Sequence, residues 1–178
     1  MARIFRKPSS IKLPQRDREA QREEYGREGA GISECPDCGN VKFRKRWYRS
    51  ASAVKSHLKN PPLKIKVSRK ERCPACTMIK ERVFEGEVFI DDFLKEHRKV
   101  LLNLIKNFEK EALKRDPQDR IITLEKTQAG WRITTTENQL ADRLAKKIKG
   151  AFNTVKISFS HSKEPFEVDR VHVVFGVK

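Results

Sequence analysis

Apolar positions in the second half of the chain first predict a long amphipathic helix. Between residues 93 and 112 apolar side chains recur at a spacing of three or four, which places them on one helix face. Asp91 or Asp92 is expected to cap its start, and the helix is expected to end before Asp116-Pro117. The predicted buried positions are Phe93, Leu94, Leu101, Leu104, Ile105, Phe108 and Ala112.

The pattern then predicts a hairpin and a second helix. The segments RIITLEK and WRITTT flank TQAG, a turn that contains Gly130. Thr136, with Gln139 three residues later, forms the signature of a capping box, and Gly150 is the expected end of the helix. The predicted buried face consists of Leu140, Ala141, Leu144, Ala145 and Ile148.

Two further strands complete the pattern. Apolar and polar residues alternate in VKISFS, and a second strand begins at FEV after the turn HSKEP. The apolar phase of this last strand shifts before VHVVF, which predicts a β-bulge near Asp169–Arg170. Residues 85–178 are thus expected to form a small domain of order α-β-β-α-β-β.

The first part of the chain shows no comparable pattern. Residues 1–34 are polar and charged with Pro and Gly breaks, which predicts an extended or disordered basic arm. Residues 35–84 contain one short alternating run, Leu63, Ile65 and Val67, which predicts a strand with one buried face.

All four cysteines fall in residues 35–84, in the two pairs CPDCG and CPAC. Two residues between thiolates let both sulfurs face one ion, and four thiolates form the closed tetrahedral set of a structural zinc site. Cys35, Cys38, Cys73 and Cys76 are therefore the predicted Zn²⁺ ligands. A redox pair would need only one Cys-x-x-Cys, and disulfides are unusual in a cytosolic chain. The predicted fold class is α+β: a four-cysteine zinc ribbon with a long basic insertion, followed by the small domain.

Charge concentrates in the same region. The 178 residues include 40 Lys or Arg and 24 Asp or Glu, a formal charge of +16. Residues 1–82 hold 22 basic and 9 acidic side chains, whereas residues 83–178 hold 18 and 15. Twelve basic residues and one acid, Glu71, lie between Cys38 and Cys73. Such a field suits a polyanion, with nucleic acid first and an anionic membrane second.

The basic insertion interleaves cations with aromatic residues. Arg pairs with phosphates through two hydrogen bonds, Lys supplies a point charge, and aromatic rings stack on unpaired bases. Phe43 and Trp47 fit a small core equally well, whereas Tyr48 is the better stacking candidate. The predicted nucleic-acid contacts are Lys42, Arg44, Lys45, Arg46, Trp47, Tyr48, Arg49, Lys55, Lys59, Lys64, Lys66, Arg69 and Lys70.

Catalysis and membrane insertion find little support in the sequence. The four histidines show no ligand spacing, and no phosphate-binding loop, nucleophile elbow or dinucleotide fingerprint occurs. No apolar run reaches the roughly 18 residues of a membrane span, and no apolar signal segment is present. The basic, serine-containing start has some features of an organelle transit peptide but lacks a regular apolar face. We therefore expect a cytoplasmic, non-enzymatic protein without a small-molecule substrate.

The order of these motifs also carries a family resemblance. CPDCG, the basic segment with Trp47, CPAC, a long helix and ITTTENQLADRLAKKIKGAF resemble, over residues 35–175, a group of small uncharacterised bacterial proteins. More distantly, the cysteine region and the small domain look like parts of the large-ribosomal-subunit nuclear export adaptor of eukaryotes and its archaeal relatives. That family has four-cysteine zinc sites and binds the large ribosomal subunit. This chain is shorter, has one four-cysteine set and lacks an export-signal region, so an export role does not carry over.

The resemblance and the charge together imply a hypothesis. The chain is expected to associate with the ribosome through ribosomal RNA, chiefly of the large subunit, and with ribosomal proteins. It would act in assembly, quality control or hibernation. The alternatives are a DNA-binding zinc-ribbon transcriptional regulator and an enzyme that acts on RNA.

Overall fold

The computed structural model describes residues 32–58, 67–91, 95–152, 154–162 and 167–176. Residues 1–31 of the predicted arm, most of the predicted strand at 63–67, and Lys59, Lys64 and Lys66 lie outside the described residues. The last three residues of the predicted arm, 32–34, instead form a strand that pairs within a sheet, so that part of the prediction is wrong. So do Phe93 and Leu94 of the first predicted helix. No described helix combines the length and the apolar character that a membrane span requires.

Residues 32–82, here called the cysteine module, form a small mixed sheet with two helices. The strand order is β3-β2-β1-β4, with β1 antiparallel to β2 and parallel to β4. Ile32, Val41 and Val54 form a small buried cluster, because so short a segment has few apolar side chains to bury. The elements are β1 (Ile32–Glu34), β2 (Val41–Phe43), β3 (Arg46–Tyr48), α2 (Ala51–Ser56), β4 (Val67–Lys70) and α3 (Pro74–Glu81).

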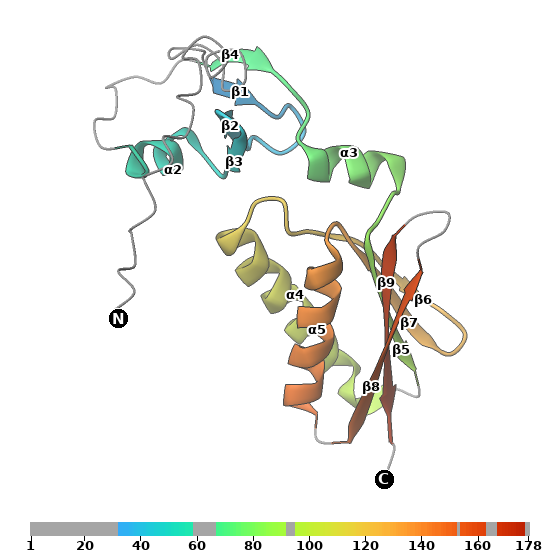
Figure 1. The fold of residues 1–178 in the computed structure, drawn as a ribbon. Coiled ribbons are helices and arrows are strands. Elements are labelled where there is room, and N and C mark those ends of the chain that lie inside the picture. The colour runs from blue at the N-terminus through green and yellow to red at the C-terminus, as the bar shows by residue number, and fades with distance from the viewer. Residues whose placement is uncertain (1–31, 59–66, 92–94, 153, 163–166, 177–178) are drawn as a thin grey trace, which may run out of the picture. The chain divides into compact units, whose positions relative to one another are not determined.

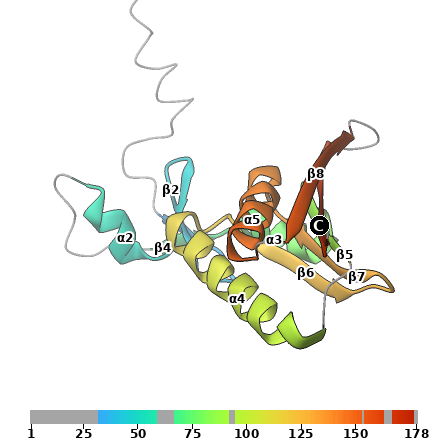
Figure 2. The ribbon, with the colours of Figure 1, turned by 90° about the horizontal axis from the view of Figure 1, so that it is seen from below.

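The α+β domain that follows is a five-stranded sheet with two helices on one face, as Figures 1 and 2 show. Its strand order is β6-β7-β5-β9-β8, and only the pair β5 and β9 is parallel. The elements are β5 (Gly86–Asp91), the 3-10 turn η1 (Lys95–His97), α4 (Arg98–Arg115), β6 (Ile121–Lys126), β7 (Gly130–Thr135), α5 (Asn138–Ala151), β8 (Val155–Ser162) and β9 (Val168–Phe175).

One apolar core joins the sheet to both helices. The five predicted positions of α5 are all buried, and the described positions of the α4 stripe are buried or partly buried. Val88, Ile133 and Val171 supply the facing side chains from three neighbouring strands. The α+β class, the β6–β7 hairpin and the buried face of α5 are therefore confirmed.

The predicted order of the domain missed its central strand. β5 lies between β7 and β9, where Val88 and Ile90 are buried, so the described order begins β-α rather than α. The expected cap at Asp91 is also wrong, because Asp91 ends β5 and α4 starts at Arg98, with His97 at its cap position. Asp92, the alternative cap, lies outside the described residues.

Two local predictions in the C-terminal half are wrong for different reasons. The capping box does not form, because the Thr136 hydroxyl donates to the Gln118 carbonyl at 2.7 Å and Glu137 occupies the cap position. The predicted bulge is absent as well, since β8 and β9 pair without a shift from Val155–Phe175 to Ser162–Val168. Val168 is buried on the sheet face opposite to that of Val171, which explains the change of apolar phase without a bulge.

Candidate metal centre and basic hairpin

The four cysteines converge from two segments that are far apart in the sequence. Cys35 and Cys38 lie in the turn between β1 and β2, and Cys73 and Cys76 lie at the start of α3. All four are free thiols, and their Sγ atoms lie within 4.8 Å of one another. The predicted clustering of the cysteines is therefore confirmed.

The first pair is positioned by a tight turn. The Gly39 N–H donates to the Cys35 carbonyl at 2.9 Å, and the Cys35 N–H donates to the Asn40 carbonyl at 2.7 Å. Gly39 has φ +71°, a left-handed conformation that glycine adopts with little strain. This turn brings both sulfurs to one side before the chain enters β2.

The second pair is positioned by the beginning of a helix. Cys73 is the N-cap of α3, and its Sγ accepts the Cys76 N–H at 3.4 Å. Pro74 occupies the first helical turn, where its missing N–H costs nothing. The helix start therefore fixes the two sulfurs of this pair on one turn.

The distance between two of the sulfurs matches that expected around a tetrahedral metal ion. Zn–S bonds of about 2.3 Å place tetrahedral sulfurs about 3.8 Å apart. Cys38 Sγ and Cys73 Sγ are 3.7 Å apart. Cys35, Cys73 and Cys76 are buried and Cys38 is partly buried, as a closed structural site requires. The four cysteines could hold a metal ion without a change of fold.

Neighbouring groups shift the pKa values of the cysteine thiols in different directions. Burial raises the pKa of Cys35, but hydrogen bonds from the backbone at Cys73, Asp37 and Cys38 outweigh it and lower the pKa to about 7. Burial raises the pKa of Cys73 and of Cys76, and the neighbouring sulfurs raise the Cys76 value further. Crowded thiols resist joint ionisation, and a bound cation would relieve that resistance.

Groups around the cysteines supply donors to the sulfurs. The Cys73 N–H donates to Cys35 Sγ at 3.3 Å, and the Arg120 guanidinium lies 3.8 Å from Cys76 Sγ. The Ala75 N–H donates to Gln118 Oε1 at 3.1 Å, which ties the start of α3 to the segment before β6. Arg120 was not among the predicted site residues, because it lies 44 residues from Cys76 and no local pattern marks it. Such outer groups orient ligands and balance their charge.

The chain between the cysteine pairs forms a hairpin with a cationic tip. β2 and β3 pair from Val41–Tyr48 to Phe43–Arg46, so Arg44 and Lys45 form a two-residue turn. Arg44, Lys45 and Arg46 are exposed, and Arg44 has φ +57°, which is unusual for a bulky side chain. The base of this hairpin follows directly on the first cysteine pair.

The three aromatic residues of the hairpin pack on the module and also lie beside cations. Trp47 contacts the buried cysteine cluster, whereas Phe43 and Tyr48 contact the cluster around Val54. The Arg46 guanidinium lies 5.7 Å from the Tyr48 ring centre, and Arg44 lies 5.3 Å from that of Phe43. All three rings are partly buried, so each contributes to a small core.

The other predicted contact residues do not gather in one patch. Arg69 and Lys70 lie exposed on β4, at the sheet edge opposite β3. Lys42 Nζ lies 2.5 Å from Glu71 Oε1, and this pairing lowers the pKa of Glu71. Arg49 is exposed just after β3, and Lys55 is partly buried on α2. The hairpin tip is thus the densest cationic group among the described residues of the module.

No protein-family model matches the chain, and no curated protein matches it.

Proposed function

We propose that the chain is a zinc-binding protein that docks on RNA through the cationic tip of the β2–β3 hairpin. The observation that carries this proposal is the placement of Arg44, Lys45 and Arg46 on a turn whose base follows the cysteine cluster. A metal at the cysteines would hold the hairpin base, and the tip would present its charges to a phosphate backbone. The role is binding rather than catalysis.

The donor set favours zinc as the metal. Four thiolates in a closed tetrahedral arrangement are typical of structural Zn²⁺ sites. The module's buried apolar clusters are small, so metal binding would supply free energy that its core does not. Cys35, Cys38, Cys73 and Cys76 would be the ligands.

The charge of the hairpin region favours a nucleic acid. Residues 41–58 contain six Lys or Arg side chains and no Asp or Glu. Arg and Lys on an irregular, exposed turn suit the accessible backbone of folded RNA. No described element of the module has the helix-turn-helix form that reads duplex DNA.

Ribosomal RNA is the RNA that the family resemblance favours. The resemblance to the large-subunit export adaptor points to the large ribosomal subunit, with ribosomal proteins as neighbours. We propose that the chain acts there in assembly, quality control or hibernation, in the cytoplasm.

Sedimentation of the full-length protein from lysate tests the ribosomal assignment. At low salt the protein should co-migrate with one ribosomal subunit and should move to the top of the gradient after RNase treatment. High salt should release it, because the contacts are ionic. Migration at the top at low salt without RNase would contradict the ribosomal assignment.

A charge-removal variant tests the hairpin directly. Arg44→Gly combined with Lys45→Gln and Arg46→Gln removes three charges, and glycine suits the left-handed position. The slope of log K against log salt is negative for RNA binding, and its magnitude for ribosomal RNA should decrease by about 2 to 3. The matched control, Lys80→Gln with Lys126→Gln and Lys156→Gln, should leave the slope nearly unchanged. Equal slopes in both variants would refute the hairpin contact, and equal competition by duplex DNA would favour a DNA-binding regulator.

A further inference from the structure

The charge of the α+β domain is divided unevenly between its helices and the rest of the domain. α4 and α5 together carry ten Lys or Arg and three Asp or Glu side chains. The remaining part of residues 83–178 therefore has eight basic and twelve acidic side chains. The net charge of residues 83–178 is therefore small, although the two helices are strongly basic.

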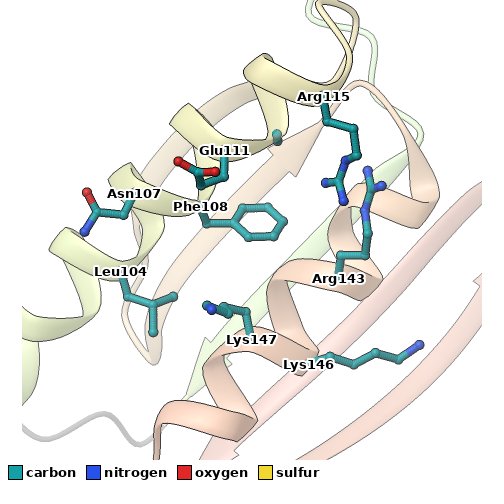
Figure 3. A pocket seen from close by; sticks show the side chains of 9 residues that line it. Leu104, Asn107, Phe108, Glu111, Arg115, Arg143, Lys146 and Lys147 are labelled. Atoms are coloured by element: carbon teal, nitrogen blue, oxygen red, sulfur yellow. The ribbon is translucent and has the colours of Figure 1, made fainter.

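A hollow of about 820 Å³ lies between these two helices (Figure 3). Leu104 and Phe108 point into it from α4, and the buried Ala112 completes an apolar floor. Both apolar side chains are only partly buried, so the hollow exposes apolar surface between the two helices. The volume lies within the usual range for ligand sites.

Cations from both helices line the hollow. Arg115 comes from α4, and Arg143, Lys146 and Lys147 come from α5. Figure 3 shows Lys147 reaching toward the apolar floor, and Arg115 and Arg143 facing each other at one end. Glu111 is the acidic residue among the lining side chains, and Lys114 Nζ lies 2.7 Å from its carboxylate.

A buried carboxylate holds Arg143 in place and lies near Arg115. Asp119 accepts a hydrogen bond from Arg143 at 2.7 Å, and the Arg115 guanidinium lies 4.0 Å from the same oxygen. Asp119 therefore orients Arg143 and offsets part of the positive charge of the two arginines, and the Glu137 carboxylate also interacts with Arg143. Arg115 is exposed enough to donate to a phosphate, and Arg143, whose Nη2 donates to Asp119, adds positive charge beside it.

From this arrangement we infer that the hollow between α4 and α5 is a second RNA site, which holds one RNA strand. The phosphates would contact Arg115, Arg143 and Lys147, and an unpaired base or a ribose would lie on Leu104 and Phe108. The basic surface extends along both helices beyond the hollow, which suits the regular charges of a nucleic acid better than a peptide with a few carboxylates. This inference rests on the proposed RNA-binding function but concerns a separate surface.

The uncovered face of the sheet offers a contrast within the same domain. There the buried Glu87 carboxylate accepts hydrogen bonds from Arg132 at 2.5 Å and from Arg170 at 2.9 Å. Glu125 also lies 3.6 Å from Arg132, so two carboxylates face these two arginines. Lys126 and Lys156, exposed on the edge strands β6 and β8, therefore provide matched control positions.

Binding of a fluorescein-labelled oligouridylate to the full chain tests the inference. Arg115→Gln with Lys147→Gln removes two charges from the hollow. The magnitude of the slope of log K against log salt should then decrease by about 1.4. The control, Lys126→Gln with Lys156→Gln, makes the same change in net charge and should leave the slope as in the wild type. Equal slopes in the two variants would overturn the inference.

Phe108→Leu separates a base contact from charge, because leucine keeps an apolar side chain in the floor. It should weaken oligouridylate binding about five- to tenfold with an unchanged salt slope. The variant must remain folded at the assay temperature, as a single cooperative thermal transition above it would show, and a variant that binds as tightly as the wild type would remove the base contact. If polyglutamate competes as well as oligouridylate at equal charge and Phe108→Leu has no effect, the hollow binds an acidic protein segment instead.

The two RNA sites can fail separately. If the hairpin variant weakens RNA binding and the Arg115/Lys147 variant does not, only the second site is refuted. If the reverse holds, the hollow remains an RNA site and the hairpin contact is refuted. A wild-type chain that binds neither oligouridylate nor ribosomal RNA would refute both.

Discussion

The cysteine module buries its apolar side chains in two small groups, whereas the α+β domain buries thirteen in one core. One group in the module consists largely of the cysteines themselves, with Ala75 between them and Trp47 packed alongside. The domain core instead connects five strands and two helices through side chains such as Ile90 and Leu144. Burial of apolar side chains therefore stabilises the α+β domain more than it stabilises the cysteine module.

This difference bears on how a chain of low apolar content can carry so many basic side chains on its surface. Small modules rarely gain enough free energy from burial alone, and a bound metal can supply the remainder. If the four cysteines bind a metal as proposed, the module needs fewer apolar side chains and can carry more charge on its surface. The domain has a large core and carries its excess of charge on the outer sides of α4 and α5.

The largest expected effect is the loss of the module on removal of a metal ligand. Cys73→Ser keeps a hydroxyl at the helix cap but removes one thiolate, and zinc binding is worth about 10–16 kcal/mol in small zinc-finger peptides. The variant should lose its zinc, and residues 32–82 should lose amide protection in hydrogen exchange. The amides of the α+β domain should remain protected.

A cap variant in the same module is the matched control for the zinc ligand. Ser50 caps α2 by accepting the Ala53 N–H at 3.2 Å. Ser50→Ala should cost about 1 kcal/mol and leave the zinc content at one ion per chain. Retained zinc and unchanged protection in Cys73→Ser would show that the cysteines do not support the module through a metal.

A smaller effect is expected from a pair of glycines that tests close packing in the α+β domain. A Cβ at Gly130 would lie 1.8 Å from the Ile90 carbonyl oxygen, because β7 and β5 approach closely there. Gly130→Ala should lower the free energy of unfolding by more than about 1 kcal/mol and leave the zinc content unchanged. Denaturant unfolding measures this loss.

Gly150, in the last turn of α5, is the contrasting position. A Cβ there meets nothing within 4 Å, and the residue is helical. Gly150→Ala should raise the free energy of unfolding by roughly 0.5–1 kcal/mol, since alanine favours helix more than glycine. If both alanine variants changed stability equally, backbone packing between β5 and β7 would not explain the role of Gly130.

Features coded by neighbouring residues were predicted well. The spacing of each Cys-x-x-Cys pair and the three-to-four spacing in α5 depend on short segments, and both predictions agree with the structure. Features that depend on distant partners were not. β5 pairs in parallel with β9, about 80 residues away. Its apolar alternation is short, with Val88 and Ile90 buried, and no turn residue separates it from the cysteine module in the sequence.

Competing partners explain the other differences between sequence and structure. Thr136 has the right spacing for a capping box, but the Gln118 carbonyl takes its hydroxyl proton instead. The basic layer of α4 and α5 was missed because charge was counted along the sequence, where acidic residues of the sheet and the loops cancel it. Only the fold separates those acids from the helices.

The smallest expected effect concerns pH and compares two glutamates on α4. Burial raises the pKa of Glu109, and the nearby charge of Arg120 offsets only part of that rise. The hydrogen bond from Lys114 instead lowers the pKa of Glu111. The fold therefore disfavours the charged form of Glu109 and favours the charged form of Glu111.

The two carboxylates should therefore shift stability in opposite directions as pH changes. The protonated Glu109 contributes stability below about pH 4, its unfolded value, and this contribution is lost as pH rises through its raised folded pKa. Glu109→Gln should thus unfold at a slightly higher temperature than the wild type at pH 7, with the difference closing toward pH 4. Glu111 contributes stability above the same unfolded value, so Glu111→Gln should be slightly less stable at pH 7 and equal to the wild type in acid.

Acid should also release a metal from the cysteines in the same pH range, because the thiols must be deprotonated to bind it. The α+β transition must therefore be followed separately, by the fluorescence of Trp131 in a Trp47→Phe background. A difference of the same sign for both glutamate variants at pH 7 would show that burial of Glu109 does not destabilise its charged form.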